Sequence, residues 1–592
     1  MRRADWKRNL AETSRRNRIE LVEAKLTRRD LFKLGLLTAS GFLVTKLGLS
    51  SRAAGADNVA SPPTTPWLEP LPIPPVARPL RVAAVTPLPT KQANTAQGEA
   101  SRADHQSWDQ FFDADNCDVY VNENRVTQVS WHRELPLDEC WLFNGLFPGP
   151  WIHARYGTPV IIRNRNLLPT VAEHQGYGRP TPSTHLHNGH TPSESDGNPL
   201  DTFPTGLFKD NLYPNACAGF DPGQRNPRGD IRETLSSLWY HDHCVEFTAQ
   251  NVYRGNMGLY SLFNEFDTGD ENDPSQTAWR LPSGAFDVPL VFHDRVFDAR
   301  GRAVFDLFNL DGILGDKFTV NGKIQPFLRV ARRKYRFRLL NIGTSRFYNF
   351  FLSNGQKFVQ CTHDGNFLPR PITVANVRMA VASRVDLVVD FSRLADGAEL
   401  FLVNCQEQTD GRGPTGKILP LAQGTPVLKF IVDGTIDTKG DPSRIPDRFL
   451  DLPPADPREA VTTRTFIFDR DNGGWSVNGK QFDPEVILGS PRQGTAEIWQ
   501  FVNNSGGWMH PVHTHFEEEQ ILSRNGAPPP ADEISRGDVV WLGHGESVKT
   551  FRRFRNFLGR YPTHCHNVVH EDHAMMMRWD IVANGGDTNT QP

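Results

Sequence analysis

The sequence predicts an all-β protein assembled from several similar domains. Its 592 residues exceed what one hydrophobic core usually organises, so two to four domains are expected. The chain contains 48 Gly and 45 Pro, and its apolar stretches are short runs such as "TPVIIRNRN", "RVDLVVDF" and "TRTFIFD". Such runs, separated by turn residues, are typical of β-strands, and long stretches with helical periodicity are scarce.

The first 56 residues differ from the rest of the chain. They carry 13 Lys or Arg and 5 Asp or Glu, and Arg28 and Arg29 precede a mildly apolar stretch that ends near "AGA" at 54–56. This pattern resembles a twin-arginine signal with a small-residue cleavage site. The alternative is an amphipathic anchor or membrane helix, but Gly, Thr and Lys46 interrupt the apolar stretch. We therefore predict that residues 1–56 engage the twin-arginine (Tat) export machinery and that the mature chain is periplasmic or secreted.

Charge and hydropathy exclude two classes of partner. Residues 1–56 have a net charge of +8 against −3 for the whole chain, so the remainder carries −11. A nucleic-acid-binding surface of basic residues is therefore not expected, and no apolar run in the mature chain is long enough to span a membrane. An exported protein can oxidise its cysteines, but seven is an odd number and the sequence does not determine their pairing. The seven are Cys117, Cys140, Cys217, Cys244, Cys361, Cys405 and Cys565.

An internal repeat follows a Pro-rich lead at residues 57–114, which we predict to be extended and not a domain. Each copy reads aromatic, any residue, apolar, Asn-Gly, strand, short polar gap and second strand, and the copies begin at Trp141, Phe318 and Trp475. Asn-Gly alone is a common hairpin signal, but three copies in one frame predict three homologous β-domains. We place these domains at residues 115–270, 271–450 and 451–592.

Four histidine pairs have one intervening residue each. In a strand, residues i and i+2 point to the same face, so each pair can offer one imidazole to each of two neighbouring metal ions. Eight imidazoles suit copper, zinc, iron or nickel and do not suit Ca²⁺ or Mg²⁺. Two pairs lie in the first predicted domain and two in the third, which predicts a metal cluster between these domains. The pairs are His185 and His187, His241 and His243, His513 and His515, and His564 and His566.

Cys565 lies between the two histidines of the last pair, and strand alternation directs it to the opposite face. We therefore expect it to serve a different metal ion, with two histidines and a weak axial methionine as in a blue-copper centre. His570 and Met575 follow along the chain, and His510 can arrive from a neighbouring strand. A zinc hydrolase would need neither the thiolate nor the axial methionine.

The segments "THLHNG", "WYHDH", "HPVHTH" and "HCHNVVHEDHAM" resemble, in order, the four copper motifs of multicopper oxidases. The resemblance covers roughly residues 60–585 and is greatest to the branch of bacterial spore-coat laccases, phenoxazinone synthase and bilirubin oxidase. It implies three cupredoxin-like domains, each a Greek-key β-barrel or sandwich. It also implies four copper ions, one of type 1, one of type 2 and a type 3 pair.

The resemblance also implies which residues hold each copper. The type 1 ligands are His510, Cys565, His570 and the axial Met575, and the type 2 ligands are His185 and His513. The type 3 ligands are His187, His241, His243, His515, His564 and His566. Two positions depart from the usual motifs without displacing a ligand. Asn188 replaces the usual Gly, and Asp242, which replaces Ala or Thr, would add negative charge near the cluster.

The family reaction implies four one-electron oxidations of a small reducing substrate, coupled to reduction of O₂ to two waters. Electrons would pass from Cys565 to the cluster through the flanking His564 and His566. Forming water consumes four protons, and Asp196 and Glu571 resemble the acids that deliver them.

The substrate is open at this stage. We favour an exported, laccase-like oxidase of phenols or aminophenols over a metallo-oxidase of Mn²⁺, Fe²⁺ or Cu⁺. A non-catalytic cupredoxin-repeat protein would be expected to lack cluster histidines, and all are present. Glu517, Glu518 and Glu519 are expected to form either a solvated acidic edge or an acidic entrance for cations. Met509, beside His510, can line the substrate cleft.

Overall fold

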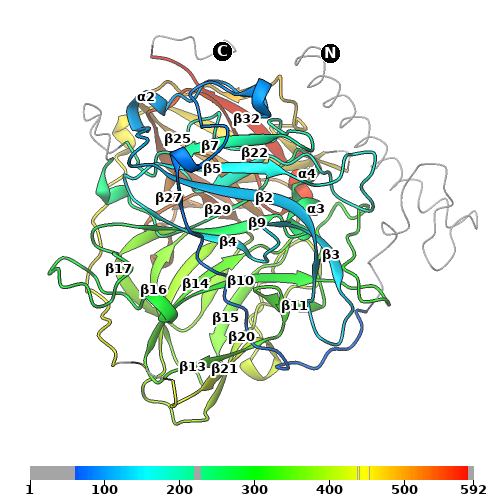
Figure 1. Cartoon of the computed structure of the whole chain (residues 1–592), viewed down its shortest axis with the longest axis vertical. Helices are drawn as coiled ribbons and strands as arrows, with labels where there is room; N and C mark the ends of the chain where they lie inside the picture. Colours follow the sequence, from blue (N-terminus) through cyan, green and yellow to red (C-terminus); the bar gives the residue numbers. More distant parts are fainter. Residues whose placement is uncertain are drawn as a thin grey trace, which may run out of the picture.

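The computed structural model describes residues 60–218, 229–436, 438, 440–452, 454–471 and 473–584, so the predicted export signal lies outside the described residues. The described chain is dominated by strands, which form three pairs of sheets. In Figure 1 the first and third sheet pairs occupy the upper half of the molecule and the second pair occupies the lower half. None of the described helices is long and apolar enough to cross a membrane.

The first sheet pair contains nine strands and supplies two of the histidine pairs. One sheet has the order β1-β2-β5-β7, with β3 paired to β2, and the other has the order β4-β9-β8-β6. The bounds are β1 Leu80–Arg81, β2 Asp118–Val129, β3 Asp138–Phe143, β4 Gly149–Arg155, β5 Val160–Asn166, β6 Thr184–His187, β7 Phe208–Tyr213, β8 Ser237–Asp242 and β9 Met257–Phe263.

The second sheet pair carries none of the predicted copper ligands. Its sheets have the orders β12-β11-β10-β14-β19-β16-β17 and β13-β21-β20-β15-β18. The bounds are β10 Asp287–Arg295, β11 Lys317–Val320, β12 Lys323–Ile324, β13 Phe327–Val330, β14 Lys334–Asn341, β15 Tyr348–Leu352, β16 Phe358–His363, β17 Asn366–Val374, β18 Val377–Met379, β19 Arg384–Asp390, β20 Glu399–Asn404 and β21 Thr425–Val432.

The third sheet pair holds the other two histidine pairs. Its sheets have the orders β23-β22-β25-β30-β27-β28 and β24-β32-β31-β26-β29. The bounds are β22 Ala460–Asp471, β23 Gly474–Val477, β24 Ile487–Gly489, β25 Thr495–Asn503, β26 His510–Thr514, β27 Glu519–Arg524, β28 Arg536–Gly537, β29 Val539–Leu542, β30 Ser547–Phe554, β31 Gly559–Cys565 and β32 Met576–Ile581.

Short helices complete the structure. They are α2 Trp108–Phe111, α3 Thr248–Tyr253 and α4 Val568–Asp572. Helices α3 and α4 contact each other, which joins the first sheet pair to the third close to the end of β31.

The three Asn-Gly segments adopt one arrangement. Asn144, Asn321 and Asn478 follow β3, β11 and β23, and each has a positive φ, of 53°, 47° and 52° respectively. Asparagine tolerates this left-handed backbone better than most residues. In each case the side-chain oxygen accepts a backbone N–H from the long strand before it. The same side-chain bond therefore closes the same turn three times.

The lead segment runs over all three sheet pairs. Pro70 forms a β-bridge with Phe327 of the second pair, and Val76 forms one with Trp151 of the first. Farther along, the Gln106 side-chain amide donates a 2.9 Å hydrogen bond to the backbone oxygen of Leu558 in the third pair. These contacts fasten the lead to the folded body.

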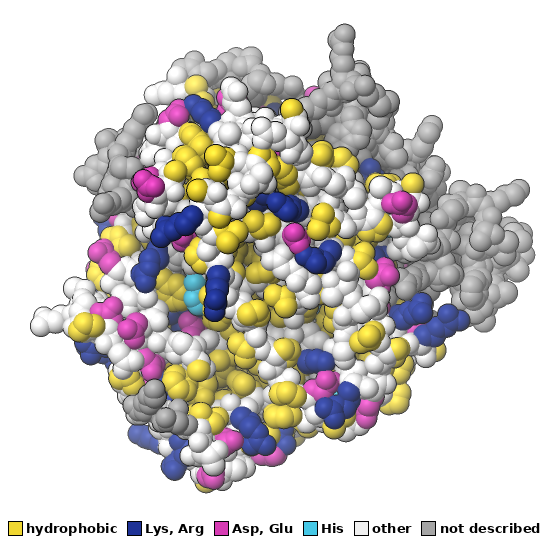
Figure 2. All heavy atoms as spheres, in the orientation of Figure 1, with side chains coloured by type: hydrophobic (Ala, Val, Ile, Leu, Met, Phe, Trp, Pro, Cys, Tyr) yellow, Lys and Arg dark blue, Asp and Glu magenta, His cyan; other side chains and the backbone are white. Residues whose placement is uncertain are grey.

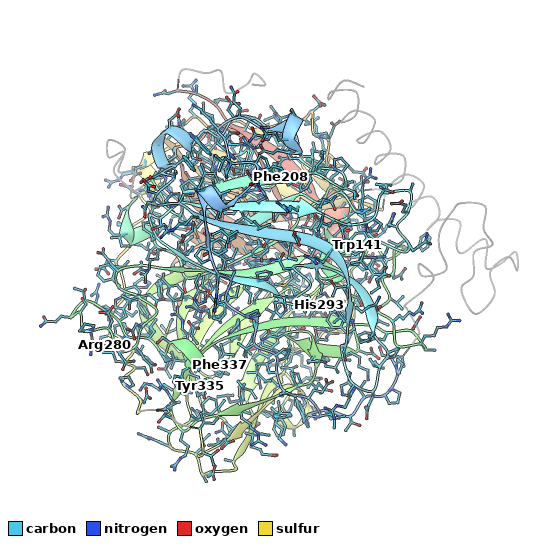
Figure 3. All side chains as sticks on the ribbon, in the orientation of Figure 1. Trp141, Phe208, Arg280, His293, Tyr335 and Phe337 are labelled. Atoms are coloured by element: carbon cyan, nitrogen blue, oxygen red, sulfur yellow. The ribbon has the colours of Figure 1, made fainter. Side chains whose placement is uncertain are left out.

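Each sheet pair encloses an aromatic-rich core. In the second pair Tyr335 and Phe337 project from β14 and stack with 5.8 Å between ring centroids, and Figure 3 shows them side by side. The third core includes Trp475, Trp499 and Trp579, all fully buried. All seven cysteines lie in the described residues, and every one is a buried free thiol. The oxidised cysteines considered from the sequence are therefore absent.

Candidate metal centre

Cys565, His510 and His570 meet at one point in the third sheet pair. Cys565 Sγ lies 3.4 Å from Nδ1 of His510 and 3.6 Å from Nδ1 of His570, and the two nitrogens are 3.3 Å apart. All three side chains are fully buried. Met575 is buried in the same core, and the backbone N–H of Cys565 donates to its carbonyl at 3.0 Å. The structure thus brings the predicted His₂Cys set together.

The outer edges of the two imidazoles are held by other groups. His510 Nε2 donates to Ser505 Oγ at 2.8 Å, and His570 Nε2 donates to the carbonyl of Asp311 at 3.1 Å. The indole of Trp475 covers the His570 ring, with 3.9 Å between centroids. Because each Nε2 is a donor, each Nδ1 presents its lone pair toward Cys565.

The eight histidines of the four pairs converge between the first and third sheet pairs. Strand register places them: His185 is opposite His241 in β6 and β8, and His513 is opposite His564 in β26 and β31. The members of each His-x-His pair then fall into different groups. The first group is His187, His241 and His566, and the second is His243, His515 and His564. The third is His185 with His513, and both of these histidines also lie close to His515.

The cluster nitrogens are arranged as ligands and not as ordinary hydrogen-bonding partners. Nε2 of His243 lies 3.1 Å from Nε2 of His564, and Nε2 of His185 lies 3.3 Å from Nε2 of His513. Nδ1 of His185 and of His513 each donates to a backbone carbonyl, so their facing Nε2 atoms carry lone pairs. Lone pairs that converge in this way repel one another unless a cation is shared between them.

Burial keeps these imidazoles in the neutral form that binds metal. Desolvation lowers the pKa of His241, His243 and His510 to about 3 in each case. Neutral imidazole nitrogen and thiolate are donors that copper prefers. The residues present therefore fit copper at both the cysteine-containing group and the histidine cluster.

Two predicted acids contact the outer edges of cluster imidazoles. Asp196 accepts from Nδ1 of His515 at 2.7 Å through its carboxylate, and its backbone carbonyl accepts from Nδ1 of His185 at 2.6 Å. Glu571, in α4, lies 3.0 Å from Nδ1 of His564 and 3.5 Å from Nδ1 of His243. Both acids are buried.

A third carboxylate, not predicted from the sequence, has a corresponding position. Asp538 Oδ2 lies 2.8 Å from Nδ1 of His187, and the Asp538 carbonyl accepts from Nδ1 of His513 at 2.8 Å. The residue stands in "SRGDVVWL", between β28 and β29, 23 residues after His515 and 26 before His564. Its neighbours in sequence carry no ligand, so no local signal indicated it.

The two motif departures have clear structural roles. Asn188 has a positive φ of 69°, the conformation that the usual glycine would adopt freely, and its amide donates to the carbonyl of Asp364 at 2.7 Å. Asp242 points away from the cluster, where its carboxylate accepts from the side-chain amide of Asn251 at 2.7 Å and from the backbone of Ser183. Burial raises the pKa of Asp242 to about 7.

The expectations for Glu517, Glu518 and Glu519 were wrong. All three carboxylates are buried and paired, Glu517 with Arg555, Glu518 with Arg536 and Glu519 with Arg552. Because each charge is offset by a guanidinium that is buried or largely buried, the segment forms neither a solvated edge nor an entrance for cations.

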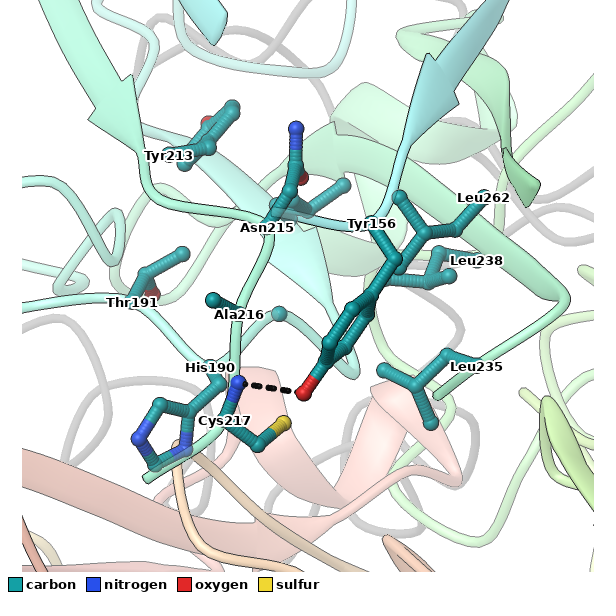
Figure 4. Close-up of a pocket in the computed structure, with 12 residues that line it drawn as sticks. Tyr156, His190, Thr191, Tyr213, Asn215, Ala216, Cys217, Leu235, Leu238 and Leu262 are labelled. Atoms are coloured by element: carbon teal, nitrogen blue, oxygen red, sulfur yellow. Dashed lines mark hydrogen bonds between the residues drawn. The ribbon is translucent and has the colours of Figure 1, made fainter. Parts of the chain in front are cut away.

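A small hollow in the first sheet pair lies apart from the cluster. It is bounded by leucines and by Tyr156, His190 and Cys217, with no cluster histidine among its lining residues. Figure 4 shows the Cys217 backbone N–H donating to the Tyr156 hydroxyl, a bond of 3.0 Å. The face in Figure 2 likewise shows basic and acidic side chains interspersed with apolar ones, with little histidine exposed. The imidazoles of the metal centre are all buried.

The fold and the donor sets together define a copper-binding cupredoxin-type protein. Comparison with known proteins agrees: the family model described as multicopper oxidase matches residues 453–584. A laccase of Bacillus subtilis (strain 168) is 31% identical over 76% of this chain and 91% of its own length. A bilirubin oxidase of Albifimbria verrucaria is 30% identical over 87% of this chain and 81% of its own length. The chain belongs to the multicopper oxidase family.

Solved structures agree on the fold. A laccase from Pediococcus acidilactici superposes with a TM-score of 0.69 at 20% identity, covering 91% of this chain and 100% of that one. A metallo-oxidase from Campylobacter jejuni gives a TM-score of 0.64 at 18% identity, covering 89% and 99%. The protein is accordingly an all-β, three-domain, copper-dependent oxidoreductase that uses O₂ as electron acceptor.

Proposed function

We propose that this protein is an exported, laccase-like oxidase that takes electrons from a phenolic or aminophenolic substrate and passes them to O₂, with four copper ions per chain. The type 1 copper is assigned to His510, Cys565, His570 and the axial Met575. The type 2 copper is assigned to His185 and His513. The type 3 pair is assigned to His187, His241 and His566 on one side and to His243, His515 and His564 on the other. The groups of converging nitrogens support this division.

When bound, copper supplies the one-electron redox chemistry and the site of O₂ reduction. The chain supplies the connection between the two sites. Cys565 is covalently continuous with His564 and His566, and these two histidines belong to different groups of the cluster. An electron that leaves the thiolate therefore has a short covalent path to either group.

The chain also supplies the protons. Glu571 lies beside His243 and His564, and Asp196 beside His185 and His515, so one acid stands at each side of the cluster. We assign both as proton-delivering residues for the formation of water. Their burial keeps bulk water from bypassing this route.

The observation that carries the substrate assignment is an aromatic stack leading to His570. Half-buried Trp508 meets Trp475 edge to face at 5.4 Å, and Trp475 covers His570 at 3.9 Å. The guanidinium of Arg470 lies over both indoles, at 4.4 Å from Trp508 and 4.7 Å from Trp475. An aromatic reductant can stack on such a surface, as phenols do with indoles.

The charges around this stack disfavour metal cations as substrates. Arg412, with 54% of its side chain exposed, lies 4.7 Å from the Trp508 ring and 3.9 Å from the Asp410 carboxylate, so this acid too is paired with an arginine. Asp311, whose backbone carbonyl contacts His570, has its carboxylate paired with Arg470 at 2.6 Å. The acidic segment that might have attracted cations is buried elsewhere. An electron-rich or anionic organic molecule therefore fits this surface better than Mn²⁺ or Fe²⁺.

The export proposal rests on the twin arginine at Arg28 and Arg29 and on the small residues at 54–56. A twin-arginine route accepts proteins that are already folded, which suits a chain whose metal sites lie between domains. Changing both arginines to lysine is expected to keep the protein in the cytoplasm, as fractionation would show.

The decisive experiment measures oxygen uptake by copper-loaded protein with a neutral phenol, an aminophenol, Mn²⁺, Fe²⁺ and Cu⁺. We expect the organic substrates to support turnover with four electrons consumed per O₂. Turnover with metal ions alone would refute the laccase-like assignment and leave the metallo-oxidase. Absence of turnover with every reductant would indicate a non-catalytic copper protein.

A further inference from the structure

The second sheet pair holds no proposed ligand, yet one of its arginines contacts an acid that lies against the histidine cluster. Arg384 begins β19 and is fully buried. Its Nη2 donates to Asp538 Oδ1 at 2.8 Å and to the carbonyl of Asp364 at 2.9 Å, and its Nη1 donates to the carbonyl of Ala382 at 2.9 Å. The guanidinium is therefore held by two carbonyls of the second sheet pair while it donates to a carboxylate of the third sheet pair.

Asp538, itself in the third sheet pair, faces one imidazole of the first sheet pair and one of the third. Its Oδ2 lies 2.8 Å from Nδ1 of His187 in β6 and 3.5 Å from Nδ1 of His513 in β26. Its carbonyl accepts from His513 at 2.8 Å. One residue therefore contacts a proposed type 3 ligand, a proposed type 2 ligand and the arginine of the middle domain.

This contact completes a pattern around the cluster. Asp196 holds His185 and His515, and Glu571 lies against His243 and His564. Asp538 stands in the same relation to His187 and His513. Six of the eight cluster imidazoles thus have their outer nitrogen against one of three buried acids, each of which serves two of them. Outer partners of this kind orient metal-binding histidines and raise their basicity.

Asp538 differs from the other two acids in being tied to an arginine. Among the described residues, Glu571 and Asp196 form ion pairs with histidines and with no guanidinium, whereas Asp538 pairs with Arg384. A carboxylate that accepts from a buried arginine is held in one orientation. It is therefore suited to fixing the positions of the rings that it contacts.

A second contact joins the same two regions. Asn188, directly after His187, donates to the carbonyl of Asp364 at 2.7 Å, and that carbonyl also accepts from Arg384. The His187 segment is therefore tied to the second sheet pair through its backbone neighbour as well as through Asp538.

We propose that Asp538 and Arg384 form a positioning pair through which the middle domain sets the orientation of His187 and His513 in the copper cluster. This inference rests on the copper assignment proposed above. In this proposal Asp538 acts through the two histidines and not as a ligand: its Oδ2 faces their Nδ1 atoms, while Nε2 of His513 faces Nε2 of His185.

The test compares copper-loaded Asp538→Asn with the unmodified protein. Asparagine keeps the shape and can still accept from Arg384, but it lacks the charge that orients the imidazoles. We expect the cluster to lose copper to a competing chelator at about 10- to 100-fold lower chelator concentration. We also expect the type 2 signal in the paramagnetic resonance spectrum to shift or broaden, while the blue absorption of the Cys565 site is retained.

Two further variants separate positioning from folding. Asp287→Asn removes another buried carboxylate, which pairs with Arg338 through 2.8 Å contacts and lies away from the cluster histidines. It should lower the unfolding temperature and leave copper affinity and the type 2 signal unchanged. Arg384→Lys keeps the charge but loses the planar fork, and should reproduce the change in the type 2 signal if Asp538→Asn does not fold.

The outcomes are distinct. Unchanged copper affinity and an unchanged type 2 signal in Asp538→Asn, with only the thermal destabilisation seen in Asp287→Asn, would overturn the positioning role. The same result in Arg384→Lys would overturn it where Asp538→Asn is not obtained. A missing type 2 signal in the unmodified protein would instead refute the copper assignment, and this inference with it.

Discussion

Glu571 Oε2 lies 3.0 Å from Nδ1 of His564, at the outer edge of the histidine cluster and one residue beyond a histidine of the cysteine-containing group. Burial alone would raise the pKa of Glu571, but the imidazoles of His564 and His243 hold it below its usual value. One short helix therefore carries both a proposed type 1 ligand, His570, and a proton-delivering acid.

Replacing that acid should slow O₂ reduction without emptying the metal sites. In Glu571→Gln the side chain keeps its shape but cannot give up a proton, so kcat is expected to fall by about 10²- to 10⁴-fold. Oxygen uptake and copper content measured on the same preparation check this. Glu497→Gln is the control, because Glu497 is equally buried but pairs with Arg464 away from the cluster. Equal kcat in the two variants would contradict the proton-delivery role.

Removing the proposed type 1 thiolate should remove one copper ion and the blue absorption that it gives the protein. Cys565→Ser lacks the sulfur that gives a blue-copper site its absorption, so we expect a colourless protein with three coppers in place of four and no substrate oxidation. Metal analysis and visible spectroscopy provide the measurement. Cys405→Ser, a buried thiol in the second sheet pair, should remain blue. Survival of the colour in Cys565→Ser would refute the type 1 assignment.

Charge reversal beside Trp508 should change substrate preference. Arg412→Glu replaces a cation 4.7 Å from the indole with an anion, and a unit charge at this distance in water contributes about 1 kcal/mol. Because the reversal changes the charge by two units, we expect KM for a phenolic carboxylate to rise roughly 30-fold, with little change for a neutral phenol. Arg458→Glu is the control, since that arginine is 91% exposed and lies outside the aromatic stack. A parallel change for both phenols would argue against an electrostatic role for Arg412.

The contact between the first and second sheet pairs should depend on Asp386. This buried carboxylate pairs with Arg336 and Arg338 and accepts from the hydroxyls of Ser236 and Ser237. Asp386→Ala would leave two buried guanidinium groups without this partner, and we expect a loss of about 3–5 kcal/mol in the free energy of unfolding. Urea denaturation monitored by tryptophan fluorescence would measure it.

The same pair predicts a pH dependence. Burial would raise the pKa of Asp386, but Arg336 and Arg338 hold it below the usual value. The ionised form therefore stabilises the fold above the unfolded-state pKa of about 3.9, and this contribution is lost as the pH falls below that value. The stability difference between the unmodified protein and Asp386→Ala should be constant near neutral pH and narrow below about pH 4. A gap that widens in acid would contradict this.

The twelve proposed copper ligands could be named from the sequence because their signal is local. Two histidines separated by one residue lie on one face of a strand wherever the strand ends up, and a cysteine between them faces the other way. The structure places His564 and His566 in the cluster and Cys565 with His510 and His570, as alternation requires. Donor chemistry then restricts the metal.

What the sequence determined by itself was the β-rich fold, the family and the ligand spacing, because these depend on neighbours along the chain. Only the tertiary structure decided the partners of those ligands. Asp538 meets Arg384 from 154 residues away, and Glu517 meets Arg555 from 38 residues away, so neither pair has a local pattern. The acidic run that looked solvated is buried because distant guanidinium groups offset its charge. A charge is exposed or buried according to what packs against it, and that is a property of the folded chain.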